Sequence, residues 1–169
     1  MELAGNFFMR KIFLFGSLLI VSVCRAQFSN GKDFVEFSKL TLEKQKTSLK
    51  VNGWKLTSST TGSKNPNAAF KVTQAVYYTL SSQNGTYALS IKAGSLPAGK
   101  MKETKLVLPD QQGLLLSSWI SELSKNGYKF SQINAYAMAA VGKTYTITIK
   151  MIPSDGYTSP ISEITYMAH

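Results

Sequence analysis

Nucleophiles, general bases and metal ligands of the usual kinds are scarce in this chain. Its 169 residues include one cysteine, Cys24, and one histidine, His169, which is the last residue. A Ser-His-Asp triad, an HExxH zinc site and a cysteine-ligated metal all need these residue types at interior positions. The sequence therefore argues against these active sites and predicts no metal and no cofactor.

The other residues that could do chemistry form no recognisable constellation. Four carboxylates are too scattered to indicate an acid/base pair, namely those of Asp110, Glu122, Asp155 and Glu163. A stretch with the spacing of a phosphate-binding loop, from Gly94 to Lys100, continues with Met101 where such a loop needs Ser or Thr. The sequence thus predicts no catalytic residue.

Aromatic side chains are the better lead to a binding site. Several lie in runs predicted to be strands, where alternation directs about half of the side chains away from the core. Exposed aromatics beside lysines stack on sugars or form protein interfaces. Four residues are our candidates for binding: Trp54, Tyr77, Tyr128 and Tyr145. The alternative for each of them is core packing.

Charge is the main oddity of the composition. Arg10, Lys11, Arg25 and Glu2 precede residue 27, so the remainder carries 16 lysines against 8 acidic residues and no arginine. Nucleic-acid recognition favours the planar fork of Arg, so this partner class is disfavoured. Lysines suit weak attraction to a protein, an anionic glycan or a membrane surface. The alternative is that the scattered lysines only keep the protein soluble.

The N-terminus has the features of a cleavable export signal. Arg10 and Lys11 precede an apolar run from Ile12 to Val23, and small residues, Cys24 and Ala26, stand at positions −3 and −1 of a cleavage site after Ala26. We therefore expect residues 1–26 to be a signal peptide and the protein to be periplasmic or extracellular. Met9 is an alternative start to Met1, and lipid anchoring through Cys24 is disfavoured because Val23 precedes it.

The part after residue 26 has the size and composition of one globular domain. The chain is 44% apolar and 17% charged, and no second apolar run is long enough to span a membrane. Its only cysteine lies in the signal, so the mature chain is cysteine-free and cannot form an internal disulfide. We expect a short polar spacer over 27–33 and a single α+β domain over 34–169.

Hydrophobic periodicity predicts two helical regions. Residues 34–51 predict a helix through at least the second half of the segment, ended by Asn52-Gly53. After Pro109-Asp110, a second helix has apolar residues at i, i+3, i+4 and i+7, followed by Asn126-Gly127. Its predicted buried face consists of Leu116, Trp119, Ile120 and Leu123.

Strand patterns complete the predicted fold. Asn84-Gly85 separates two runs rich in β-branched and aromatic residues, and Gly142-Lys143 separates residues 133–141 from 144–152. The apolar C-terminal segment 153–169 is expected to dock through residues 162–167 as a strand. The sequence therefore predicts an α+β fold with two helices packed on one face of an antiparallel sheet.

A weak internal repeat runs through these elements. Residues 39–42, a helix and then Asn52-Gly53-Trp54 are echoed by residues 105–108, a helix and then Asn126-Gly127-Tyr128. This suggests two tandem helix-plus-three-strand units, over 34–93 and 105–152. The alternative is that such residues are simply how helices end and strands begin. The layout resembles that of secreted bacterial inhibitor and adaptor domains, and no functional residue carries over from it.

Together these patterns favour an exported, non-catalytic binding module of the cell envelope or extracellular space. Any partner surface is expected on the sheet face that the helices leave open, among exposed tyrosines and lysines. The alternative is a small envelope hydrolase or transferase that uses Ser, Lys, Tyr or carboxylate chemistry. A deep pocket holding a titratable group with a shifted pKa would favour the enzyme.

Overall fold

The fold is seen in a computed structural model, which describes residues 28–62, 71–82, 85–96, 99–109, 114–153 and 161–169. The predicted signal peptide, with Cys24, lies outside the described residues, as do Asp110 and Asp155.

Three helices occur in the described part: α2 (Gly31–Lys39), α3 (Leu42–Val51) and α4 (Leu114–Lys125). The Asn30 side chain caps α2 by accepting from the backbone N–H of Asp33. Leu40 is extended and ends α2, and Thr41 caps α3 in the same way as Asn30 caps α2. The helix predicted for the second half of residues 34–51, ended by Asn52-Gly53, is thus confirmed as α3, and the first half belongs to a separate helix, α2.

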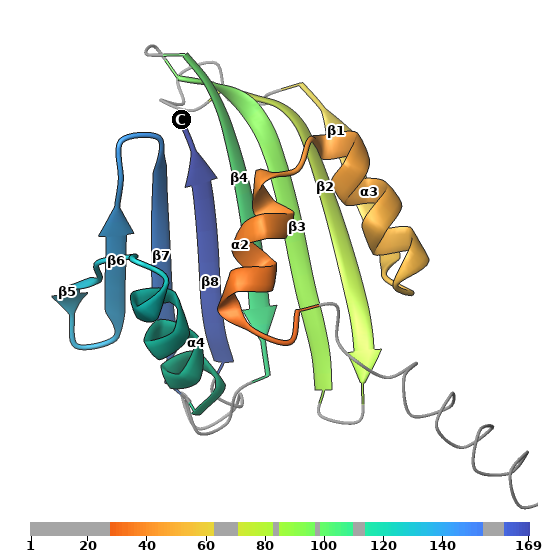
Figure 1. Cartoon of the computed structure of the whole chain (residues 1–169). Coiled ribbons are helices and arrows are strands. Elements are labelled where there is room, and N and C mark those ends of the chain that lie inside the picture. The colour runs from red at the N-terminus through yellow and green to blue at the C-terminus, as the bar shows by residue number, and fades with distance from the viewer. Residues whose placement is uncertain (1–27, 63–70, 83–84, 97–98, 110–113, 154–160) are drawn as a thin grey trace, which may run out of the picture.

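Eight strands form one sheet, and every neighbouring pair is antiparallel. Their order across the sheet is β1-β2-β3-β4-β8-β7-β6-β5 (Figure 1). Each half of the chain thus supplies four strands, one more than the repeat suggested. Their bounds are β1 (Lys55–Thr61), β2 (Lys71–Ser82), β3 (Gly85–Leu96), β4 (Gly99–Leu108), β5 (Ser131–Asn134), β6 (Ala137–Val141), β7 (Tyr145–Ile152) and β8 (Ile161–Ala168).

The C-terminal strand has a central place in this sheet. β8 pairs with β4 on one side and with β7 on the other, so it joins the two halves (Figure 1). Ile164 sits between Leu106 and Ile149 in the register, and all three side chains are buried. The prediction that residues 162–167 dock as a strand is confirmed.

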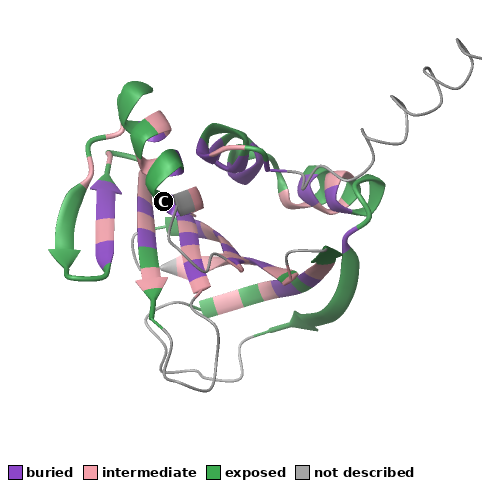
Figure 2. Cartoon of the chain, turned by 90° about the horizontal axis from the view of Figure 1, so that it is seen from below, coloured by how far each residue is buried: buried purple, intermediate pink, exposed green. Residues whose placement is uncertain are grey.

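All three helices lie on the same side of the sheet, as two views at right angles show (Figures 1 and 2). The core lies between the helices and the strand residues that face them, in alternation along each strand. The α+β fold with helices on one face is therefore confirmed. On α4, Leu116, Trp119 and Leu123 are buried as predicted, whereas Ile120 is only partly buried.

Residues 28–33 do not form the polar spacer that we expected. Phe28 is buried and packs edge-on against the rings of Phe34 and Phe37. Ser29 and Asn30 are polar because they precede and cap α2, and not because the segment is a free linker. This stretch is part of the domain.

The two helices of the repeat end in the same way. Gly53 and Gly127 both have positive φ, of 78° and 89°, which glycine adopts without a steric penalty. The next backbone N–H, of Trp54 or Tyr128, donates to the carbonyl oxygen five residues earlier, on Leu49 or Leu123. Both leucines are fully buried, so α3 and α4 hold equivalent places in the two halves.

A buried amide ties the helices to the sheet. Gln45, on α3, is fully buried, and its Nε2 donates to the carbonyl oxygen of Phe37, 3.1 Å away, and to Oγ1 of Thr104 on β4, also 3.1 Å away. Its Oε1 is buried and has no partner in the described part. The amide thus joins the end of α2, the middle of α3 and the sheet.

Replacing Gln45 with leucine is expected to lower the free energy of unfolding by about 1–2 kcal/mol, because two buried hydrogen bonds are lost while one unsatisfied oxygen is removed. Urea denaturation followed by circular dichroism measures this. Exposed Gln132→Leu is the control and should change stability little. A Gln45→Leu protein as stable as the wild type would show that the amide contributes no net stability.

Candidate functional site

The structure separates the four aromatic residues predicted to bind a partner. Trp54 is buried beside Phe28, so its ring belongs to the core. Tyr77 lies on β2 and is 37% exposed on the face away from the helices, because its neighbour Tyr78 faces the core. Only Tyr128 and Tyr145 come together, with ring centroids 5.4 Å apart.

The open face of the sheet differs from our expectation. Of the tyrosines within the described strands, only Tyr77 lies on it, because strand alternation places the others on the helix side. Two ion pairs cross this face, Lys92–Glu103 at 2.9 Å and Lys105–Glu163 at 3.0 Å. Much of the remainder is small or hydroxylic: Ala75, Thr79, Ser90, Thr146, Thr148 and Thr165. The face lacks a cluster of aromatic side chains.

Tyr128 and Tyr145 belong to a tyrosine cluster on the helix side. Tyr145 on β7 also stacks on buried Tyr166 of β8, at 6.2 Å and an interplanar angle of 14°. Burial raises the pKa of Tyr166, and the nearby Lys39 ammonium opposes that rise. Lys39 itself is paired with Glu36 at 2.9 Å. The rings mostly contact one another, so this cluster is packing between β7, β8 and the segment after α4.

Exposed apolar side chains gather instead around the β5–β6 hairpin. Four of the large hydrophobic residues that the structure exposes lie on this hairpin or on the adjoining β7: Ile133, Tyr136, Val141 and Ile152. Tyr136 is 54% exposed and stands in the two-residue turn between the strands. Apolar patches of this kind on a protein surface mark sites of interaction.

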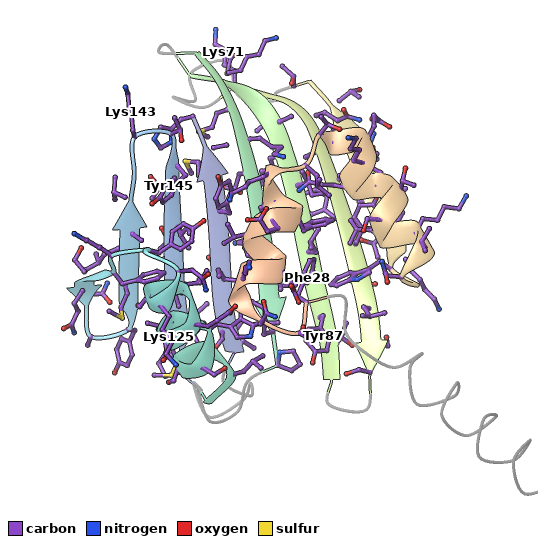
Figure 3. The ribbon with its side chains drawn as sticks, viewed as in Figure 1. Phe28, Lys71, Tyr87, Lys125, Lys143 and Tyr145 are labelled. Atoms are coloured by element: carbon purple, nitrogen blue, oxygen red, sulfur yellow. The ribbon has the colours of Figure 1, made fainter. Side chains whose placement is uncertain are left out.

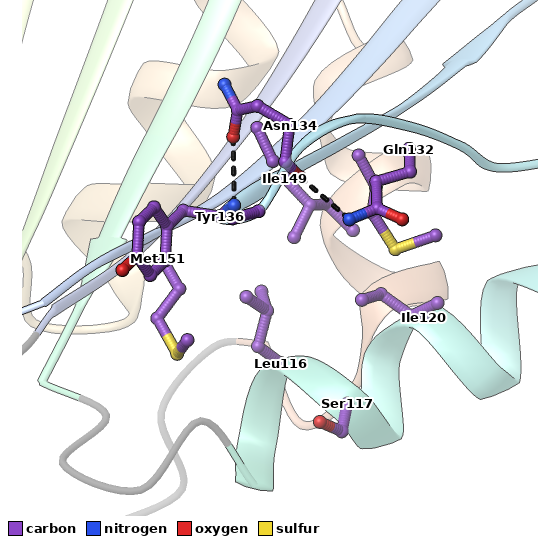
Figure 4. A pocket seen from close by; sticks show the side chains of 11 residues that line it. Leu116, Ser117, Ile120, Gln132, Asn134, Tyr136, Ile149 and Met151 are labelled. Atoms are coloured by element: carbon purple, nitrogen blue, oxygen red, sulfur yellow. Dashed lines mark hydrogen bonds between the residues drawn. The ribbon is translucent and has the colours of Figure 1, made fainter.

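A groove opens beside this hairpin, between it and the first half of α4. It has a volume of about 320 Å³ and a largely apolar lining, formed by Leu116 and Ile120 of α4 and by Met138, Ile149 and Met151 of the sheet. Figure 4 shows Leu116 and Ile120 reaching from the helix toward the strands, with Tyr136 and Met151 across from them. We call it the β5–β6 groove.

Two side-chain amides shape the polar rim of the groove. Gln132 Nε2 donates to the carbonyl oxygen of Asn134 at 3.2 Å, and Asn134 Oδ1 accepts from the backbone N–H of Tyr136 at 2.9 Å (Figure 4). The second bond fixes the turn that carries Tyr136. Oε1 of Gln132 and Nδ2 of Asn134 take no part in these two hydrogen bonds and, because both residues are exposed, can reach water or a ligand.

A second hollow of about 450 Å³ adjoins the groove around the same turn. Ala135, Tyr136 and Met151 line both of them, and Lys150 and Ile152 complete the second. No carboxylate lines either hollow. Lys102, whose pKa burial lowers, lies elsewhere and donates to the carbonyl oxygen of Leu40. The largely apolar lining of the groove suits an apolar group held by shape and amide contacts.

The sequence contained a partial signal for this groove. Residues 133–141 were predicted to be one strand, but Ala135 and Tyr136 form a turn that divides it into β5 and β6. Ile120, placed on the buried face by helical periodicity, instead borders the groove. The indication available from the sequence was the absence of charge in residues 131–141.

No protein-family model matches the chain, and no curated protein and no solved structure resembles it significantly.

Two negative findings hold for the described residues. No group of three or more His, Cys, Asp or Glu side chains lies close enough to hold a metal ion. No described helix has the length and apolar character needed to cross a bilayer.

Proposed function

We propose that this chain is an exported, non-catalytic binding module that holds an apolar side chain of a partner protein in the β5–β6 groove. The observation that carries the proposal is the coincidence of an apolar groove with exposed Ile133, Tyr136 and Ile152 at one edge of the sheet. Interfaces commonly place an apolar anchor in such a pocket, with aromatic residues around it.

The composition of the groove favours a protein over the other partners considered. Met138 and Met151 give it a flexible, polarisable floor that adapts to different apolar side chains. An anionic glycan would need several cations at the site, and Lys150 is the one charged residue lining the two hollows. Ser117 lines the groove, but neither a lysine nor a carboxylate lines it beside this serine, so the lining does not supply the pair of groups that Ser–Lys or carboxylate catalysis needs.

Methionine methyl groups provide a direct test, because the chain carries its own internal control. Met138 and Met151 line the groove, whereas Met101 and Met167 lie on the opposite face of the sheet. We expect NMR spectra of the 13C-methyl-methionine protein, titrated with fractionated envelope protein from the producing cells, to show shifts at Met138 and Met151 only.

Ala135→Trp is the matching variant, because residue 135 is exposed and borders both hollows. The new indole should obstruct the groove and weaken the binding that the methyl shifts report at least about tenfold. A loss of this size is expected when an interface anchor is blocked. Val51→Trp, at an exposed site on α3, is the control. Shifts at Met167 in place of Met138 would refute the groove and point to the open sheet face.

A further inference from the structure

We propose that the partner binds as an extended peptide that pairs with β5 as a ninth strand, with one apolar side chain in the β5–β6 groove and acidic residues on either side. This inference rests on the proposed function and specifies its geometry. β5 is the outermost strand of its half, and all four of its residues are exposed (Figure 2).

The β5 edge lacks the charged side chains and prolines that commonly block strand addition, and its four-residue length and the bulge between Gln132 and Asn134 are the protections that it does have. Natural edge strands carry lysines, prolines or inward-pointing charges, because unpaired backbone N–H and C=O groups recruit other chains. β5 has none of these, and residues 131–141 contain no charge at all. Its sequence, Ser-Gln-Ile-Asn, instead exposes Ile133. An edge left open in this way is suited to pairing with an added strand.

The register places the groove where an added strand would use it. Gln132 pairs with Met138, so both side chains lie on the helix side, where Met138 lines the groove. Residues directly opposite each other in neighbouring strands share one face of the sheet. The partner residue opposite Gln132 therefore points to the helix side, beside the rim of the groove that Gln132 forms. Backbone pairing and an apolar anchor can thus be satisfied together.

Charge specifies what should flank the anchor. Residues 123–154 include four lysines and no acidic residue. Lys129 comes just before β5, and Lys150 pairs with Ala137 beside the turn that ends it. Lys143 extends from the β6–β7 turn, away from the sheet (Figure 3). Acidic residues at both ends of the peptide would be attracted to these lysines.

The test uses a nine-residue synthetic peptide in which three leucines alternate with two threonines and two acidic residues stand at each end. Titrated into the labelled full chain, it should shift Met138 and Met151 saturably at a concentration below about 1 mM. It should also slow hydrogen exchange of backbone amides in residues 131–134. Raising the salt, or replacing the acidic ends with lysines, should weaken binding at least about tenfold, since exposed charges are screened.

A peptide with proline in place of the threonines separates strand addition from simple insertion of a side chain, because proline cannot donate to a sheet ladder. We expect this peptide not to bind. Equal methyl shifts with the proline peptide would overturn strand pairing and leave groove binding intact. The inference would also be overturned if the parent peptide caused no shift up to about 2 mM, because a dissociation constant above this concentration is too weak for recognition. The titration with envelope protein tests the groove separately.

Discussion

Trp119→Ala is expected to lower the free energy of unfolding by about 3–5 kcal/mol, the range for truncating a large buried aromatic. The Trp119 side chain is 1% exposed and stacks at 6.4 Å on Phe34, so it holds α4 against α2. Gly31 shows how close this packing is, since a Cβ there would lie 3.2 Å from Cβ of Trp119. Chemical denaturation followed by far-ultraviolet circular dichroism measures the loss.

Trp119→Phe is the informative comparison. The indole Nε1 is buried and has no hydrogen-bond partner in the described part, so phenylalanine removes volume without breaking a hydrogen bond. Its effect should stay below about 3 kcal/mol, less than that of the alanine variant. Val51→Ala, on an 80% exposed side chain, should have almost no effect. An alanine variant within about 1 kcal/mol of the wild type would contradict the central role given to this core residue.

The strongly patterned elements could be predicted from the sequence. The face of α4 follows from the spacing of Leu116, Trp119 and Leu123, and β8 follows from the apolar residues of the C-terminal segment. These predictions succeed because helical and strand periodicity directly reflect which face is buried. The sequence did not predict α2 as a separate helix, because Leu40-Thr41, where it gives way to α3, contains neither Gly nor Pro.

The β5–β6 groove was harder to predict because it depends on where helices and strands end relative to one another in space. Alternation shows that half of the strand tyrosines face the core, but the sequence does not tell which half. Trp54 and Tyr128 follow equivalent helix ends, and only Trp54 is fully covered, because Phe28 packs against it. The groove exists because the β5–β6 hairpin extends beyond the buried face of α4, a tertiary relation with no local pattern.

The second large effect is expected at the β6–β7 turn, where the backbone N–H of Gly142 donates to the carbonyl oxygen of Tyr145 at 2.9 Å. A Cβ on residue 142 would lie 2.3 Å from Cε1 of the Tyr145 ring. Gly142→Ala must therefore displace that ring from Tyr128 and Tyr166, and should lower the free energy of unfolding by about 1–3 kcal/mol. Urea denaturation followed by tryptophan fluorescence reports it, since Trp54 and Trp119 are both buried.

A double-mutant cycle identifies the cause. Tyr145→Ala removes the ring that the new methyl group would strike, so adding Gly142→Ala to Tyr145→Ala should cost less than about 0.5 kcal/mol. Steric overlap with one side chain predicts this rescue, because the backbone at residue 142 does not have a positive φ that would itself disfavour alanine. If Gly142→Ala costs as much in the Tyr145→Ala background as in the wild type, the glycine is required by the backbone of the turn and not by the tyrosine ring.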